Sequence, residues 1–311
     1  MQPKILLTGK SGQIGSELCR LLPSLGEVIA LGRNELDLAN PGDIRRTIRE
    51  HAPALIVNAA AYTAVDRAET DQAAAQAVNC EAPGAMAEEA RKLGATLVHY
   101  STDYVFDGTK NSPYEETDVP NPINVYGATK LAGEAAIRAS EATYFIFRTS
   151  WVYAPRGRNF LRTILKLAAE REELKVVTDQ KGAPTWSREI AAATVQVLTA
   201  ARGMRTVDPA STREIGGIYH MTARGETSWF EFATSILEEA RRRPQDLEWY
   251  RAATEDRALI VRRVLPISSR EYSTPARRPA YSVLSNAKLE RIFGVQLRDW
   301  RSQLHSVFDE P

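Results

Sequence analysis

Residues 4–15 read KILLTGKSGQIG, and this stretch sets the fold class of the chain. Its first part, Lys4 to Thr8, is an apolar run typical of a buried strand, and three glycines spaced three residues apart follow it. Glycine permits the tight turn that leads from a strand into a helix, and it lets a ligand approach backbone N–H groups. The stretch therefore predicts a strand, a turn and the start of a helix, which is how a doubly wound α/β sheet begins.

The rest of the first half repeats this alternation of strand and helix. Apolar runs predict further strands at 27–31, 54–58, 96–101 and 144–148. Helical patterns lie between them, at 13–22, 41–51, 71–93 and 126–139. Strands that are apolar throughout and alternate with helices indicate a parallel sheet covered on both faces. We therefore predict a doubly wound parallel sheet of the Rossmann type, with ligands at the carboxyl ends of its strands.

The composition is that of an ordinary globular protein. With 40 basic and 39 acidic side chains, the net charge of +1 gives no electrostatic reason to expect binding to nucleic acid or to an anionic membrane. No apolar run approaches the ~18 residues that span a bilayer. The only cysteines, Cys19 and Cys80, are far apart in helical contexts and predict buried thiols in a reducing compartment, with no disulfide and no metal site. We therefore expect a cytoplasmic protein, and the scattered histidines predict no metal site.

The glycine turn predicts a dinucleotide-binding site. Its spacing is G-x-x-G-x-x-G, whereas the usual fingerprint is G-x-G-x-x-G, but the physical reason is the same: backbone N–H groups at a helix N-terminus meet a pyrophosphate. A strand–helix turn without a ligand is the alternative. The expected contacts of this turn with the cofactor are Gly9, Lys10, Ser11, Gly12, Gln13, Ile14 and Gly15.

Two further segments are expected along this cofactor. Arg33 follows the second strand at the point where an acidic residue would favour a free ribose 2′-hydroxyl, so we predict a 2′-phosphate and NADPH, with NADH left open. Asp37 and Leu38 would lie beside the adenine. The alternative for Arg33 is a solvated surface side chain. A segment of mostly small residues after the third strand would let the cofactor lie against the backbone, with simple close packing as its alternative. This segment is Ala59, Ala60, Ala61, Tyr62 and Thr63.

A tyrosine and a lysine four residues apart, Tyr126 and Lys130, share one face of a predicted helix, and Ser101-Thr102-Asp103 ends the strand before it. Because a free tyrosine has a pKa of about 10, acting as an acid near neutral pH requires roughly 4 kcal/mol of phenolate stabilisation. The Lys130 ammonium and the oxidised nicotinamide ring would supply it. We predict that Tyr126 donates a proton to a carbonyl oxygen held by Thr102 as hydride reaches the carbon. Lys130 would also bind the nicotinamide ribose.

Such a pair alone is common on helix surfaces. An active site is indicated because three features agree in their placement: the glycine turn after the first strand, the hydroxyl residue after the fourth strand, and the tyrosine–lysine pair on the next helix. These motifs and later blocks resemble the extended short-chain dehydrogenase/reductase family. The resemblance implies reduction of the 4-keto group of a dTDP-linked 6-deoxyhexulose by NADPH or NADH, the last step in making dTDP-L-rhamnose. One departure is Lys10-Ser11, where an asparagine is expected near Ser11. The matching blocks are 9–15, 58–66, 101–108, 122–134, 148–153, 159–160, 179–185, 217–220, 229–233 and 278–282.

The resemblance also implies where the substrate lies. The Trp151 indole offers a sugar a flat apolar face and an N–H donor, with a core tryptophan at a lobe interface as the alternative. Arg188 and Arg278 would form arginine forks with the diphosphate, with plain surface charge as their alternative. A nucleotide sugar is the expected partner, and its binding residues would be Thr102, Asp103, Tyr104, Trp151, Arg188 and Arg278.

The chain is expected to form two lobes. We assign 1–155 to an NAD(P)-binding Rossmann domain and 156–311 to a smaller substrate-binding α/β lobe, and we expect 178–205 to pack back on the first domain. Segments 202–215 and 241–263 match nothing in the family. Some relatives are described with magnesium at a dimer interface, but no carboxylate cluster here requires it. A homodimer stays open.

Two other functions stay open at this point. One is an epimerase or dehydratase of the same superfamily, although dehydratases usually add an acidic pair beside the threonine and only Asp103 stands there. The other is a regulatory subunit, because a relative of these reductases binds NADP and modulates methionine adenosyltransferase. The intact set of Thr102, Tyr126 and Lys130 argues against the second function.

Overall fold

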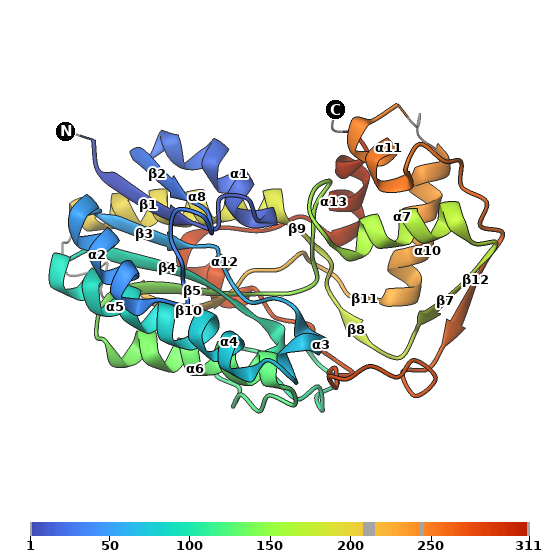
Figure 1. The fold of residues 1–311 in the computed structure, drawn as a ribbon, viewed down its shortest axis with the longest axis horizontal. Helices are drawn as coiled ribbons and strands as arrows, with labels where there is room; N and C mark the ends of the chain where they lie inside the picture. The colour runs from blue at the N-terminus through green and yellow to red at the C-terminus, as the bar shows by residue number, and fades with distance from the viewer. Residues whose placement is uncertain (1, 208–214, 243–245, 310–311) are drawn as a thin grey trace.

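The computed structural model describes residues 2–207, 215–242 and 246–309. Its centre is a six-stranded parallel sheet with the strand order β10-β5-β4-β3-β1-β2 (Figure 1). The chain runs outward from β1 to β2 and then returns through β3, so the order reverses between β1 and β3, where such sheets bind ligands. The predicted doubly wound sheet is confirmed. Its strands are β1 (Lys4–Thr8), β2 (Glu27–Leu31), β3 (Leu55–Asn58), β4 (Thr96–Thr102), β5 (Thr143–Thr149) and β10 (Gly217–His220).

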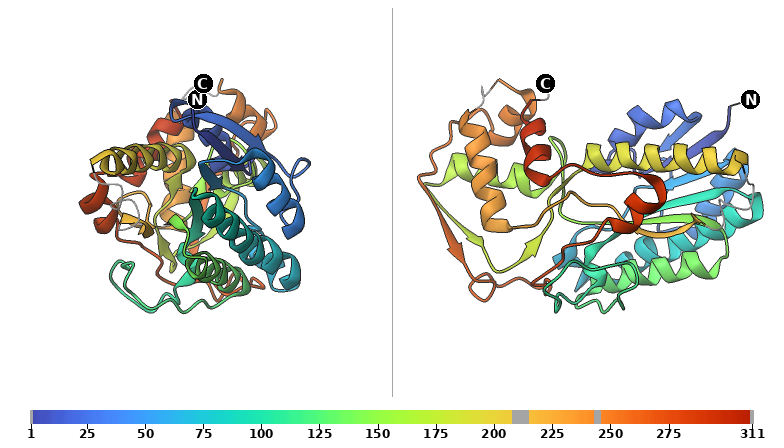
Figure 2. Two further views of the ribbon diagram at one scale, coloured as in Figure 1. Left: turned by 90° about the vertical axis from the view of Figure 1, so that its left-hand side faces the viewer. Right: turned by 180° about the vertical axis from the view of Figure 1, so that it is seen from behind.

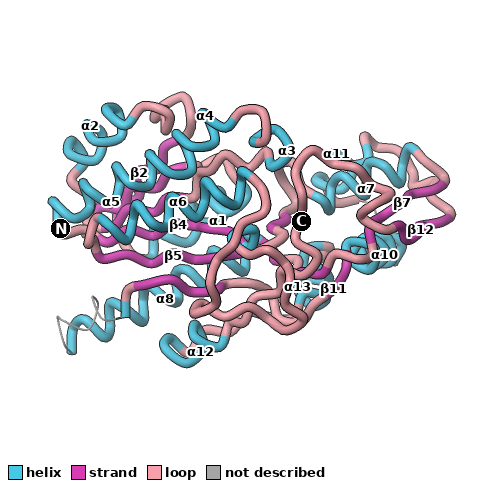
Figure 3. The backbone as a smooth tube through the Cα atoms, turned by 90° about the horizontal axis from the view of Figure 1, so that it is seen from below, coloured by secondary structure: helices cyan, strands magenta, loops and turns pink. Residues whose placement is uncertain are grey.

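Helices cover both faces of this sheet because its strands are apolar on both sides. Successive side chains of a strand point to opposite faces, so Ile5 and Leu7 enter one core and Leu6 enters the other. Figure 3 shows α8 and α12 on one side of the sheet and α2 and α4 on the other. The helices of the first face are α1 (Gln13–Leu21), α8 (Ser187–Val207) and α12 (Ala287–Phe293). Those of the second face include α2 (Pro41–His51), α5 (Ala82–Leu93) and α6 (Val125–Ala139).

The helix predicted over 71–93 is divided in the structure. A short helix, α4 (Gln72–Gln76), leads into a π-helical turn (Ala77–Glu81) before α5, and α3 (Val65–Ala68) precedes them. The wider turn buries Asn79 completely, and its amide bonds both the N–H and the C=O of Tyr62, at 2.9 and 3.1 Å. The same amide donates to the Thr129 hydroxyl at 3.2 Å. The π-turn thus ties the loop after β3 to α6, and such turns often mark functional sites.

The smaller lobe has a helical core of its own, seen beside the sheet in Figure 2. Leu161, Phe232 and Trp300 are fully buried in it. Its helices are α7 (Phe160–Glu170), α10 (Trp229–Arg242), α11 (Glu248–Thr254) and α13 (Trp300–Val307). Its paired strands are β7 (Glu173–Val177) with β12 (Arg263–Ile267), β8 (Lys181–Gly182) with β11 (Thr227–Ser228), and β6 (Val152–Tyr153) with β9 (Thr185–Trp186).

The chain passes between the two lobes several times. β10 is an edge strand of the large sheet, and α8 and α12 pack on that sheet, although all three follow residue 155. A boundary at residue 155 therefore does not separate the large sheet from the rest of the chain, and the assignment of two lobes stays a prediction. Of the two unassigned segments, 202–215 lies partly outside the described residues, and the described parts of 241–263 include α11. No described helix is long and apolar enough to cross a membrane.

Candidate active site

The residues predicted to be catalytic meet at the carboxyl end of β4. Thr102 is the last residue of that strand, and Tyr126 and Lys130 lie in the first two turns of α6. The helix begins there because Asn124 caps it: its side-chain oxygen accepts the N–H of Gly127 at 2.8 Å. The Thr102 hydroxyl accepts the N–H of Tyr104 at 3.1 Å and lies against the Tyr126 hydroxyl. The hydroxyl predicted to hold a carbonyl oxygen and the hydroxyl predicted to donate a proton are thus side by side.

The pKa of Tyr126 in the chain without cofactor is set by burial. Desolvation raises the pKa of Tyr126 to about 12; the Thr102 hydroxyl opposes the rise and the Asp103 carboxylate adds to it. Lys130 does not lower it here, because its Nζ donates to the Tyr100 carbonyl at 2.6 Å and lies 3.0 Å from His99 Nε2. The expected lowering of this pKa depends on the oxidised nicotinamide ring as well as on Lys130, so it stays a prediction for the chain with its cofactor bound. The tyrosine stays protonated at neutral pH, which is the form that a reduction needs.

Asp103 is a buried carboxyl group beside this pair, 2% exposed. Its Oδ1 accepts the Thr102 hydroxyl at 3.0 Å, while Oδ2 has no partner among the residues that the structure describes. Burial raises the pKa of Asp103 to about 7, against the opposing Ser282 and Thr102 hydroxyls. The ring of Tyr104 packs edge-on against Tyr126, with centroids 5.8 Å apart. A buried, half-satisfied carboxyl in such a position suits contact with a polar substrate.

The glycine turn is shaped by contacts that only glycine allows. Gly9 has a φ of +75°, and a Cβ on Gly15 would lie 2.0 Å from the Gly9 carbonyl oxygen. Gly12 occupies the N-cap of α1 without a side-chain cap, so the first N–H groups of the helix stay available. Gly9 N–H itself bonds the Leu31 carbonyl at 3.0 Å, which fixes the turn against β2. Open N–H groups at a helix N-terminus fit a pyrophosphate.

The adenosine end of this site contains a residue that the sequence reading missed, Glu35. Its Oε2 accepts the N–H of Gly32 at 2.6 Å, and its Oε1 pairs with the Lys10 ammonium. The available signal was its place just after β2, where acidic side chains meet ribose hydroxyls. Arg33 is exposed next to it, and Asp37 is exposed with its carboxylate on the Ala39 N–H at 2.9 Å. A cationic and an anionic side chain therefore both follow β2, where a ribose is expected.

The other predicted cofactor contacts follow β3 and β2. Ala59, Ala60 and Ala61 are half-buried after β3, beside the switch point of the sheet. The Tyr62 hydroxyl donates to Asp71 Oδ2 at 3.0 Å, so its ring is held at the edge of the loop. Leu38 packs against the core under α2 and α5. Thr63 is exposed at the end of the loop.

Trp151 lies where the two lobes meet and is held under strain. Its φ of +46° is unusual for a bulky residue, and its indole stacks on that of Trp229 with centroids 3.4 Å apart. Gly182 makes room for it, since a Cβ there would lie 2.4 Å from the Trp151 ring. Strain of this kind is common at ligand-binding sites. Trp229 was predicted only as part of a family block, because a stacking partner 78 positions away leaves no local pattern.

The two predicted phosphate-binding arginines have different settings. Arg278 is near the catalytic residues: it pairs with Asp66 at 2.8 Å, donates to Thr274 at 2.6 Å, and its charge acts on the pKa of Tyr104. Arg188 begins α8 and lies over the Trp186 ring at 5.6 Å. The structure thus brings Arg278 to the Tyr104 side of the site, and it places Arg188 at the junction of β9 and α8.

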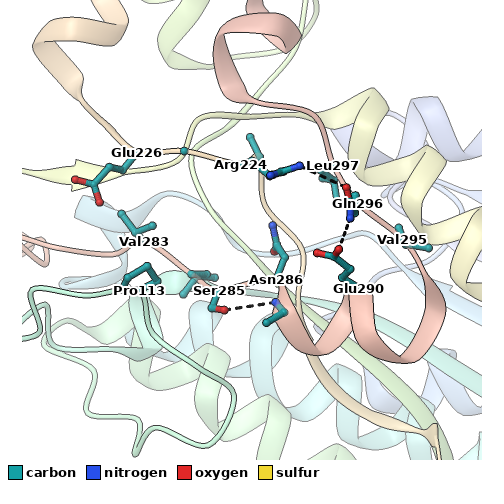
Figure 4. Close-up of a pocket in the computed structure, with 14 residues that line it drawn as sticks. Pro113, Arg224, Glu226, Val283, Ser285, Asn286, Glu290, Val295, Gln296 and Leu297 are labelled. Carbon is teal, nitrogen blue, oxygen red and sulfur yellow. Dashed lines mark hydrogen bonds between the residues drawn. The ribbon is translucent and has the colours of Figure 1, made fainter.

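A cleft of about 350 Å³ lies elsewhere, between 223–226 and 283–297 (Figure 4). In its wall, Arg224 donates a hydrogen bond to Gln296 at 3.4 Å, and the Gln296 amide donates a hydrogen bond to Glu290. None of the predicted site residues lines it, so the cavity is separate from the chemistry described above. Within the described part of the chain, no three His, Cys, Asp or Glu side chains gather as a metal site.

The sheet, the open glycine turn and the Thr102–Tyr126–Lys130 set define the class: an extended short-chain dehydrogenase/reductase. A sequence model of the family described as RmlD substrate binding domain matches residues 3–311. The chain belongs to this RmlD family.

Relatives and solved structures agree with this family. The dTDP-4-dehydrorhamnose reductase of Burkholderia thailandensis is 50% identical over 298 residues, covering 96% of this chain and 95% of that protein. The enzyme of the same name from Salmonella typhimurium is 43% identical over 310 residues, covering 98% and 97%. The crystal structure of dTDP-4-dehydrorhamnose reductase from Bacillus anthracis in complex with NADP is 33% identical, with a TM-score of 0.84 and full coverage of both chains.

Proposed function

We propose that the protein reduces the 4-keto group of dTDP-4-dehydro-6-deoxy-L-mannose to dTDP-L-rhamnose, a precursor of cell-surface polysaccharide, with NADPH as the hydride donor. The observation that carries the proposal is the placement of Thr102 and Tyr126 together at the carboxyl end of β4. The sugar-nucleotide identity of the substrate follows from the reductases to which the chain is 50% and 43% identical.

The residues divide the work of the reaction between them. NADPH, when bound on the glycine turn, supplies the hydride. The Thr102 hydroxyl holds the keto oxygen, where negative charge develops, and the protonated Tyr126 hydroxyl donates the proton. Asp103 Oδ2, which is buried next to Thr102, is free to accept a sugar hydroxyl. The stacked indoles of Trp151 and Trp229 offer an apolar wall between the lobes.

The test is oxidation of NADPH, followed by its absorbance, with dTDP-4-dehydro-6-deoxy-L-mannose as substrate and NMR identification of the sugar product. We expect dTDP-L-rhamnose. Turnover of the keto sugar to an epimer without net loss of NADPH would favour the epimerase alternative. A folded protein that binds NADPH and turns over no keto sugar would favour the regulatory alternative.

Changing Gly182 to alanine is expected to raise KM for the keto sugar by about 10-fold, which corresponds to about 1.4 kcal/mol. The added methyl group would lie 2.4 Å from the Trp151 ring and push it away from Trp229. Steady-state kinetics measure KM, and NADPH titration by fluorescence checks that the cofactor site is unchanged. Gly203→Ala is the control, because its new Cβ meets nothing within 4 Å. An unchanged KM in the Gly182 variant would remove Trp151 from the substrate site.

Changing Arg33 to alanine is expected to weaken NADPH by about 10-fold and NADH by less than about 2-fold. A charge-assisted hydrogen bond to a 2′-phosphate contributes about 1.5–3 kcal/mol, and NADH lacks that group. Dissociation constants for both cofactors come from fluorescence titration. Arg45→Ala, on the outer surface of α2, is the matched control. Equal weakening of both cofactors would refute a 2′-phosphate role.

A homodimer and a cytoplasmic location stay predictions of this proposal. The two thiols, Cys19 and Cys80, are unpaired, which suits a reducing compartment. Light scattering after size exclusion would give the oligomeric state, with a mass of twice 34.5 kDa expected for the dimer.

A further inference from the structure

A chain of hydrogen bonds runs under the carboxyl edge of the sheet and ends on Lys130. The Thr8 hydroxyl donates to Asn58 Oδ1 at 2.7 Å, and Asn58 Nδ2 lies 3.0 Å from His99 Nδ1. His99 Nε2 lies 3.0 Å from Lys130 Nζ, which donates to the Tyr100 carbonyl at 2.6 Å. Thr8, Asn58, His99 and Lys130 are each at most 2% exposed. Because water does not reach these side chains, each donor in the chain needs an acceptor among its neighbours.

The direction of each bond follows from Asn58. The backbone N–H of Ala60 can only donate, and it reaches Asn58 Oδ1 at 3.2 Å. Oδ1 is therefore the accepting end of the amide, and the NH₂ group faces His99. His99 Nδ1 must then accept, which excludes both the imidazolium and the tautomer protonated at Nδ1. The ring carries its one proton on Nε2 and directs it at Lys130 Nζ.

A nitrogen that receives an N–H has to offer a lone pair. An ammonium has three donor hydrogens and no lone pair, whereas a neutral amine has two hydrogens and one lone pair. The neutral amine satisfies both contacts of Lys130, because it donates to Tyr100 and accepts from His99. An ammonium in the same place would set two donors against each other inside a buried site, where an unsatisfied polar contact is costly.

We infer that His99 is a positioning residue that holds Lys130 as a neutral amine while the cofactor site is empty, and that cofactor binding is coupled to the uptake of one proton. A bound ribose offers hydroxyl groups as new acceptors, and keeping Tyr100 while donating to two of them requires three hydrogens. The proton comes from solvent and is added to Nζ. It consumes the lone pair that accepted from His99, and the ribose hydroxyls are the new acceptors that offset the loss of that contact. The inference rests on the proposed cofactor site.

The charges around Lys130 agree with this assignment. Burial lowers the pKa of Lys130 to about 7, and Glu134 on the same helix opposes that shift. Glu134 is itself neutralised by Arg148 of β5, at 2.7 Å, so its pull on Lys130 is weak. From β4, burial is the larger cause that holds the pKa of His99 well below its usual range, so the ring is neutral, and a charge on Lys130 would lower that pKa further. Tyr126 faces the site in its protonated form, and Asp103 lies beyond it with a pKa raised to about 7 by burial.

The first test is the tautomer of His99 in the protein without cofactor. Two-dimensional ¹⁵N–¹H NMR of the histidine rings distinguishes the two neutral forms and the imidazolium, and the signals lost in His99→Gln identify the residue. We expect the form protonated at Nε2. A ring protonated at Nδ1, or at both nitrogens, would overturn the inference and leave the reductase proposal untouched, because no cofactor takes part.

The second test is the proton balance of binding. Calorimetric titration of NADH into the full chain, in buffers of different ionisation enthalpy, gives the number of protons taken up. NADH is used because the 2′-phosphate of NADPH titrates on its own.

Since Lys130 is largely charged well below pH 7 and neutral well above it, we expect uptake of about one proton at pH 8 and little at pH 6. The Lys130→Met variant should show no uptake at pH 8 if it still binds NADH. Uptake near zero at pH 8 in the natural chain would refute the coupling, and loss of NADH binding in the natural chain would count against the cofactor site instead.

Discussion

Replacement of Tyr126 by phenylalanine is expected to lower kcat by about 100-fold or more, because general acid catalysis contributes about 10²–10⁴ to rates. The structure explains why the loss should be confined to chemistry. The ring of Tyr126 packs edge-on against Tyr104, and phenylalanine keeps that contact while removing the hydroxyl beside Thr102. The dissociation constant for NADPH should therefore change by less than about 2-fold.

Steady-state kinetics and fluorescence titration measure the two quantities for Tyr126→Phe. Tyr144→Phe is the matched control, because Tyr144 lies near the amino end of β5, whereas Thr102 and Tyr126 lie at the carboxyl ends of the strands. That variant should retain full activity. Normal turnover by Tyr126→Phe would remove Tyr126 from the mechanism, and another proton donor would then be needed.

Replacement of Arg148 by methionine is expected to lower the free energy of unfolding by about 3–5 kcal/mol. Arg148 and Glu134 form a two-point ion pair, at 2.9 and 2.7 Å, in which both residues are at most 2% exposed. Without the guanidinium, the Glu134 carboxylate would stay buried, and among the described residues the Ser101 hydroxyl, at 2.5 Å, would be its one remaining hydrogen-bond partner. The pair joins α6 to β5, so its loss also loosens the helix that carries Tyr126 and Lys130.

Urea denaturation measures this loss, with Arg45→Met as the control. Arg45 pairs with Glu88 at 2.8 Å on the exposed surface, and breaking an exposed pair costs at most about 1 kcal/mol. The double variant Glu134→Leu/Arg148→Met should recover much of the stability, because it leaves no uncompensated charge. A loss for Arg148→Met as small as that for Arg45→Met would show that the buried pair does not hold the helix in place.

The fold was predictable to a large extent because its signals are local. The apolar run and glycine turn at 4–15, with the alternation of strand and helix along the first half, indicated the parallel sheet, and the structure contains it. The π-helical turn at 77–81 was not predicted, since the helical pattern continues through it and only the amide of Asn79 requires it. The return of β10 (Gly217–His220) to the edge of the sheet was not predicted either, because a strand of four residues suits an edge position in either lobe.

The site divides in the same way between local and distant causes. Residue type and spacing were enough to predict that Tyr126, Lys130, Thr102 and the glycine turn lie at the carboxyl ends of the strands, where the structure places them; their roles stay predictions. Protonation depends on which groups folding buries together. Lys130 lies 3.0 Å from His99, 31 positions away, and burial raises the pKa of Tyr126 in the chain without cofactor. Desolvation and hydrogen-bond direction are set by distant neighbours in space, which spacing along a chain does not record.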